Sequence, residues 1–217
     1  MRLAALIFTL CGLALPAAAQ EASVHGLVQA RLVVPSNEIA WMDGGFGKLR
    51  YGSADSDPSV QLSDIYLEGT VRATPALSFT ATIKHDPEQL EPVDIVEGYV
   101  RYRPVSTSPW RWSVKAGAFF PPISFENNEI GWTSSYSITP SAINSWIGEE
   151  LRSVGVEGEL EWRSMDRTIS LVGSIYGWND PAGILLAMRG WGMTDRVTGV
   201  FDTIRLTDFF ANRIGAD

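Results

Sequence analysis

The sequence predicts an all-β protein whose strands form an antiparallel meander. Apolar and polar residues alternate one by one in seven runs after residue 20, which is the pattern of strands with one apolar and one polar face. Short turns and long polar loops alternate between these runs. Aromatic residues stand near the ends of the runs rather than in their middles. Together these features favour the wall of a transmembrane β-barrel, in which polar faces line water and apolar faces touch lipid.

Residues 1–19 have the pattern of a secretory signal peptide. Arg2 gives a positive start, residues 3–15 form an apolar run that is too short to span a bilayer, and Ala17 to Ala19 form a small-residue cleavage site. The one cysteine, Cys11, lies within this segment. The mature chain is therefore expected to have no disulfide, which fits a bacterial periplasm or outer membrane better than a small secreted domain.

The charge balance argues against nucleic acid as a partner. Lys and Arg together number 17, against 25 Asp and Glu, whereas binding to phosphates needs a basic surplus. No run after residue 19 is apolar for long enough to form a transmembrane helix. Nucleic-acid binding and a helical membrane anchor in the mature chain are thus both disfavoured.

The sheet is expected within residues 20–178. The alternating runs predict strands at residues 24–34, 62–72, 77–84, 95–103, 111–118, 154–162 and 169–176. Residues 35–59 have the composition of turns, so we expect a loop there, with one short strand near residues 48–51. Residues 73–76 make a short hairpin turn, and residues 85–93 make a longer polar loop at the opposite end.

Two segments lack the strand pattern. Residues 120–150 are rich in Ser, Asn, Pro and Trp, and we expect this long loop to fold inward, because a loop of this length in a compact domain needs a function. Residues 179–217 are expected to form a tail that resembles an extracellular loop. Within this tail, residues 184–189 fit either one or two helical turns or an apolar plug, and residues 208–214 fit a short helix.

The aromatic residues provide an independent argument for a membrane. Phe79, Tyr102, Trp112 and Trp162 all lie at the short-turn end of their strands and on the apolar faces. Amphipathic rings prefer the headgroup boundary, so this placement is typical of an aromatic belt at one membrane interface. The alternative is that these rings fill the core of a soluble β-sandwich.

The polar faces carry two groups of charge. The basic group crosses four neighbouring strands, and its members are Arg72, Lys84, Arg101, Arg103, Arg111 and Lys115. The acidic group lies on the strand after the long loop and in the loop itself, at Glu157, Glu159, Glu161, Glu126, Glu129, Glu149 and Glu150. We expect the two groups to line a narrow passage as opposed walls, where their field sets ion preference. The alternative for each residue alone is a solvated, salt-bridged side chain with no role in selectivity.

No set of residues indicates catalysis, and we expect no cofactor. Glutamates at positions i and i+2 of one exposed strand are about 7 Å apart and lack an apolar pocket that would shift a pKa, so a pair of glycosidase carboxylates is disfavoured. His25 and His85 are isolated, and no spacing of His, Asp and Glu suggests a metal site.

Several segments resemble the Gram-negative outer-membrane porins, and most closely the porin-like proteins related to the phosphate-selective group. They are residues 115–123, 131–133, 139–146 and 148–152, which look like the strand, the inward-folded loop and the returning strand of that family. The resemblance implies a passive channel in the bacterial outer membrane, a homotrimer at full length, that contacts outer-membrane lipid and passes small hydrophilic solutes or ions. Phosphate selectivity does not carry over, because acids dilute the basic residues.

The predicted barrel is incomplete. Bacterial barrels have an even number of strands, whereas seven runs are present, and residues 215–217 do not end a strand on an aromatic residue. We therefore expect an N-terminal portion of a longer porin, folded as an open, curled sheet. Two alternatives remain open. One is a small eight-stranded outer-membrane barrel for adhesion or anchoring, with its last strand at residues 199–204, and the other is a soluble periplasmic β-sandwich that binds carbohydrate.

Overall fold

The computed structural model describes residues 21–35, 38–40, 51–52, 57–87, 89–123, 125–138, 141, 152–178, 180–189 and 197–203. The predicted signal peptide at residues 1–19 lies outside this part of the chain. So do the second half of the long loop, apart from residue 141, the tail beyond residue 203, and nearly all of the short strand expected near residues 48–51.

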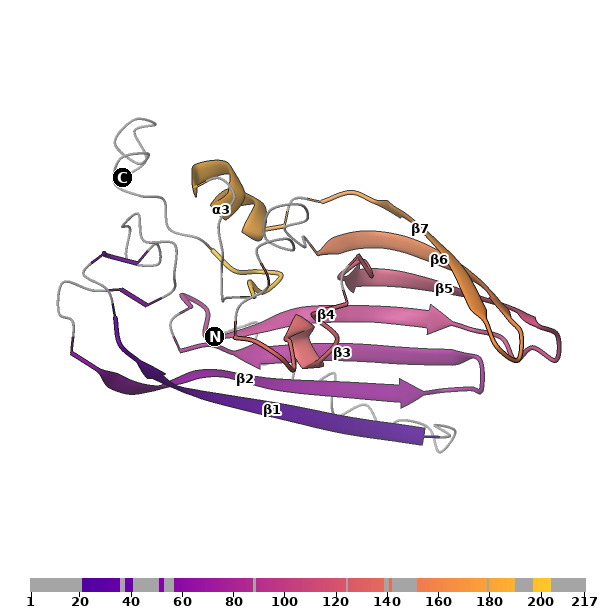
Figure 1. Ribbon diagram of the computed structural model, residues 1–217, viewed down its shortest axis with the longest axis horizontal. Coiled ribbons are helices and arrows are strands. Elements are labelled where there is room, and N and C mark those ends of the chain that lie inside the picture. Colours follow the sequence, from indigo (N-terminus) through magenta and orange to yellow (C-terminus); the bar gives the residue numbers. More distant parts are fainter. Residues whose placement is uncertain are drawn as a thin grey trace, which may run out of the picture.

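The strands of the described residues form one antiparallel sheet of seven strands (Figure 1). The strands are β1 (Glu21–Val33), β2 (Ser59–Arg72), β3 (Leu77–His85), β4 (Val93–Tyr102), β5 (Trp110–Phe119), β6 (Ser153–Arg163) and β7 (Thr168–Tyr176). Their order in the sheet is their order in the chain, and each strand pairs with the next. The predicted all-β meander is therefore confirmed.

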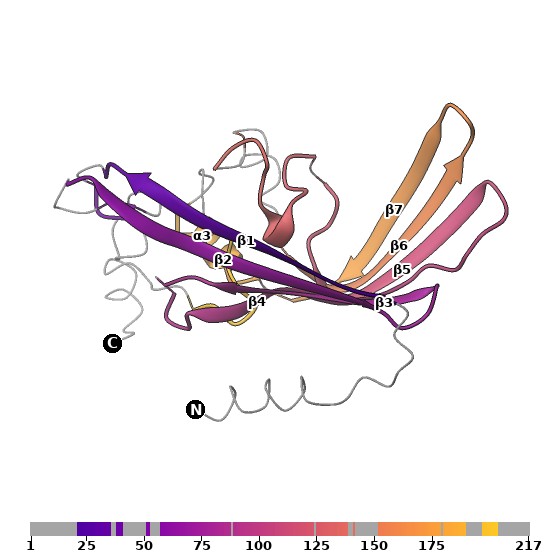
Figure 2. The same ribbon diagram turned by 90° about the horizontal axis from the view of Figure 1, so that it is seen from below.

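The sheet is curved and open. Figure 2 shows β1 and β2 rising along one side and β5, β6 and β7 along the other. Among the described residues, β1 and β7 are the two edges of the sheet, because neither pairs with a further strand. The seven strands do not close into a barrel, because β1 and β7 do not pair with each other.

Two β-bulges interrupt the regular alternation of faces that the sequence predicts. The register shifts between Gln29 and Ala30 in the β1–β2 pair and between Thr82 and Ile83 in the β3–β4 pair. The sequence pattern places Val96 on the apolar face, but the extra residue in β4 turns it to the opposite face, where it is fully buried. A bulge adds one residue to a strand, so it exchanges the two faces beyond that point.

One face of the sheet, which we call the apolar face, is exposed in every strand. Its exposed large apolar side chains are between 36% (Ile65) and 85% (Ile175) exposed. They include Val24, Val28, Leu32, Val60, Leu67, Phe79, Ile83, Val100, Tyr102, Trp112, Val114, Val156, Leu160, Ile169 and Leu171. No described part of the chain covers this face, so the main apolar surface of the strands faces away from the core.

The opposite face, which we call the polar face, carries the only cluster of buried apolar residues in the described chain. Tyr66, Val96 and Phe120 form this cluster, and Leu27, Ile130, Trp132 and Val197 pack against it. The short helix η2 (Ile130–Trp132) belongs to the long loop, and the Trp132 ring stacks on the Phe120 ring at 4.7 Å. The described part of the long loop therefore packs onto the polar face, over β1, β2 and β3.

Gly131 allows η2 to approach the sheet so closely. Its φ is +67°, and a Cβ there would collide with the Tyr66 ring. We expect Gly131→Ala to cost about 1–3 kcal/mol of docking free energy, because a non-glycine residue is strained at this φ and the ring must move. Faster proteolytic cleavage of the loop would show this. Gly158→Ala is the matched control, since a Cβ there meets nothing within 4 Å, and equal cleavage of both variants would contradict the prediction.

The chain beyond β7 returns to the sheet. Helix α3 (Ala182–Arg189) forms where the sequence pattern fits either helical turns or an apolar plug. Residues 197–203 then lie beside β4, where the Val200 amide donates to the Ile95 carbonyl at 2.8 Å. An eight-stranded barrel would need its last strand at residues 199–204. Residues 199–203 are described, and they form a turn rather than a strand.

Candidate functional site

The charged side chains of β5 and β6 lie next to each other on the polar face. The register pairs Arg111 with Glu161, Ser113 with Glu159 and Lys115 with Glu157. The prediction that the basic and acidic groups face each other across a passage is therefore wrong for Glu157, Glu159 and Glu161. In a meander, β6 is the direct neighbour of β5. Adjacent rows of opposite charge largely cancel each other's field across the sheet.

Lys115 and Glu157 form the most enclosed of these pairs. The Lys115 Nζ lies 3.0 Å from the Glu157 Oε1, and the two side chains are only 9% and 8% exposed. The ammonium also lies over the rings of Phe119, at 4.1 Å, and Tyr99, at 5.4 Å. These contacts hold the lysine in place through charge and through the ring quadrupoles.

Glu161 is the acceptor for two arginines near the short turns. The Arg163 Nε lies 2.7 Å from its carboxylate and the Arg103 Nη2 lies 3.5 Å from it. Both arginine side chains are more than two-fifths exposed. Exposed pairs of this kind contribute little to stability.

The other predicted basic residues have different environments. Arg72 pairs with Glu21 at 2.5 Å in an exposed position. Arg101 lies opposite Lys115 in the β4–β5 register and over the Tyr99 ring at 5.7 Å. Within the described part of the chain, the Nε atoms of Arg101 and Arg111 have no hydrogen-bond partner. Arg111 nevertheless lies opposite Glu161 in the β5–β6 register.

Lys84 is not exposed on the polar face, contrary to its predicted pore-lining position. Its side chain is fully buried, lies 3.4 Å from the Asp86 carboxylate, and donates a hydrogen bond to the Val197 carbonyl. The reason is the return of residues 197–203 over this end of the sheet, which a strand pattern does not predict.

The loop acids are partly described. The Glu126 carboxylate accepts a hydrogen bond from the Ser141 amide at 2.8 Å, and the hydrogen bonds from Ser141 lower the pKa of this exposed group. Glu129 accepts a hydrogen bond from the Ser135 hydroxyl at 2.7 Å. Both acids therefore hold turns of the loop together. Glu149 and Glu150 lie outside the described residues.

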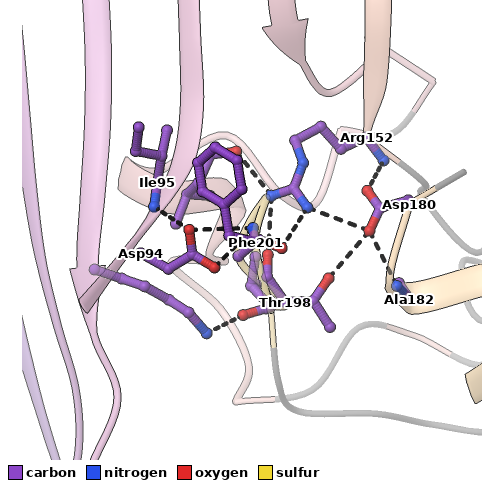
Figure 3. Close-up of polar contacts among 11 residues, drawn as sticks. Asp94, Ile95, Arg152, Asp180, Ala182, Thr198 and Phe201 are labelled. Carbon is purple, nitrogen blue, oxygen red and sulfur yellow. Dashed lines mark hydrogen bonds and ion pairs between the residues drawn. The ribbon is translucent and has the colours of Figure 1, made fainter. Parts of the chain in front are cut away.

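Arg152 is the centre of a buried polar cluster that the sequence analysis did not identify as a site (Figure 3). Its Nη1 donates to the carbonyls of Val96 and Thr198, each at 2.9 Å, and its Nη2 donates to the Gly199 carbonyl at 2.9 Å and to the Asp180 carboxylate at 3.2 Å. Burial lowers the pKa of this guanidinium, and the Asp180 charge acts in the opposite direction.

Two carboxylates complete this cluster. Asp180 accepts hydrogen bonds from the amides of Arg152 (2.8 Å) and Ala182 (3.0 Å), so it also caps the start of α3. Asp94 accepts one from the Phe201 amide at 3.0 Å. An aspartate and a proline just before a helix are a recognisable capping signal, but nothing local indicates that Asp180 pairs with an arginine at position 152.

The predicted aromatic belt lies on the apolar face. Phe79, Tyr102 and Trp112 are between 44% and 47% exposed, and the rings of Tyr102 and Trp112 are 5.6 Å apart. Trp162 is half-buried and lies opposite Trp110 in the β5–β6 register. Trp110, which is 55% exposed, extends this group and was missed because the strand was expected to begin one residue later.

Comparisons with protein-family models, with curated proteins and with solved structures give no match. Among the described residues, no helix is long and apolar enough to cross a membrane. The same residues contain no group of three His, Cys, Asp or Glu side chains that would hold a metal ion.

Proposed function

We propose that this chain forms part of the wall of an outer-membrane porin, through which small hydrophilic solutes or ions diffuse passively. The observation that carries the proposal is the exposed apolar face, which extends over all seven strands. Soluble proteins seldom expose a continuous apolar surface of this extent, whereas a barrel wall presents one to lipid.

The polar face supports the same proposal. It bears ion pairs such as Lys115–Glu157 and Arg103–Glu161, and the described part of the long loop packs on it. In a barrel this face lines the water-filled interior. The adjacent positive and negative rows suit a weakly selective passage, because little net field remains across it.

The alternatives of the sequence analysis receive less support. A soluble β-sandwich needs a second sheet over the apolar face, and the described residues form one sheet only. A small eight-stranded barrel needs a last strand at residues 199–204, of which residues 199–203 form a turn. No observed feature favours a carbohydrate site over a passage.

Fractionation of a Gram-negative host that expresses the whole 217-residue chain tests the proposal. We expect the protein in the outer-membrane fraction, to be released only by detergent. These seven strands form an open sheet, so stepwise currents in a planar lipid bilayer are expected when the chain is restored to a full-length, closed barrel. Recovery of a soluble monomer from the periplasm would refute the membrane location. A full-length protein that resides in the outer membrane but gives no currents would indicate an anchoring role instead of solute passage.

A further inference from the structure

Residues 197–202, which we call the strap, cover the long-loop end of the polar face. Beneath the strap lie Lys84 and Asp94, both buried, from β3 and β4. Lys84 donates to the Val197 carbonyl, and Asp94 accepts from the Phe201 amide. A Cβ on Gly199 would collide with the Asp94 carboxylate, so the strap backbone lies directly against this side chain.

Polar contacts account for most of the attachment of the strap. Val197 is the strap residue that packs against the apolar cluster, whereas the Phe201 side chain is 63% exposed. The carbonyls of Thr198 and Gly199 are both bound by the Arg152 guanidinium. A segment held mainly by charge-assisted hydrogen bonds depends on the side chain that donates them.

Arg152 joins the strap to other parts of the fold. The same guanidinium binds the Val96 carbonyl in β4 and the Asp180 carboxylate next to α3 (Figure 3). It also lies over the Phe120 ring, at 5.7 Å. Phe120 begins the long loop and stacks on Trp132 of η2. One side chain thus contacts both the strap and the base of the long loop.

We propose that the strap is a closure of the polar face that Arg152 locks to the base of the long loop, so that strap and loop are released together. The strap closes the end of the face that contains Lys84 and Asp94, and its release exposes both. The contacts of the strap and of Arg152 are independent of the porin proposal, since they hold in the sheet in any environment.

Thiol labelling tests the lock. In a Cys11→Ser background, which removes the one native cysteine, a single cysteine at Thr198 reports on the strap, because Thr198 is buried. A cysteine at Ile130 reports on η2, which packs on the apolar cluster. Adding Arg152→Gln should accelerate maleimide labelling of both reporters by about tenfold or more, because the glutamine cannot replace the guanidinium donors.

A cysteine at Ser113 controls for unfolding of the sheet. Ser113 is buried on β5, away from the strap, so its labelling rate should not change in Arg152→Gln. Unchanged labelling at Thr198 would show that Arg152 does not lock the strap. Accelerated labelling at Thr198 but not at Ile130 would refute the coupling to the loop. Accelerated labelling at Ser113 as well would show that Arg152 holds the whole sheet rather than the strap.

Discussion

An arginine in place of Val156 is expected to lower the free energy of unfolding from a bilayer by about 2–4 kcal/mol, which is the cost of a cation on the lipid face near the midplane. Val156 lies in the middle of β6 on the apolar face, is 48% exposed, and has Ala116 and Ile175 as its cross-strand neighbours. In the described sheet its neighbours on that face are apolar residues or glycines, so the new charge has no acid to pair with. Urea unfolding in lipid vesicles measures the loss, and the fraction recovered in the outer membrane should fall with it.

Val172→Arg is the matched control for Val156→Arg. Val172 is also a partly exposed valine, but it lies on the polar face of β7 directly opposite Glu159. An arginine there meets water and a carboxylate, so we expect a change within about 1 kcal/mol. Equal stability of the two variants would show that the apolar face does not contact hydrocarbon, and the porin proposal would fail with it.

The strands were predictable from the sequence because each obeys a local rule. Alternation in β3, from Leu77 to Lys84, depends only on neighbours along the chain, and one apolar face suffices to specify it. The adjacency of Lys115 and Glu157 also follows from the predicted meander, since consecutive strands pair. The prediction of opposed basic and acidic walls grouped the residues by charge and did not take the strand order into account, in which β5 and β6 are neighbours.

The parts that were not predicted depend on contacts distant in sequence. The bulge that turns Val96 inward exchanges the faces of β4, and periodicity alone does not reveal it. Arg152 binds groups from β4, from residue 180 and from the strap, and the partners lie 28 to 56 residues away. A single arginine without a repeating pattern gives no local signal of this kind. The burial of Lys84 was missed for the same reason. The strap that covers it comes from beyond residue 196, far from Lys84 in the sequence.

Removal of the Lys115 charge is expected to cost about 3–5 kcal/mol, because it leaves the Glu157 carboxylate enclosed without its cation. Lys115→Met retains the length and most of the apolar contact with the Phe119 and Tyr99 rings, so the loss reports on charge rather than on packing. Among the described residues, the Ser174 hydroxyl also donates to Glu157, at 3.4 Å, and is a weak substitute for the ammonium. Urea unfolding of the protein in vesicles or detergent measures the difference.

Two further variants determine whether the loss belongs to the pair. Lys115→Met combined with Glu157→Gln should recover most of the stability, because a neutral amide no longer needs the cation. Arg163→Ala, which removes an exposed partner of Glu161, should cost less than about 1 kcal/mol. If Lys115→Met costs no more than Arg163→Ala, water reaches Glu157 freely, and the pair is then a solvated part of the polar face instead of a structural contact between β5 and β6.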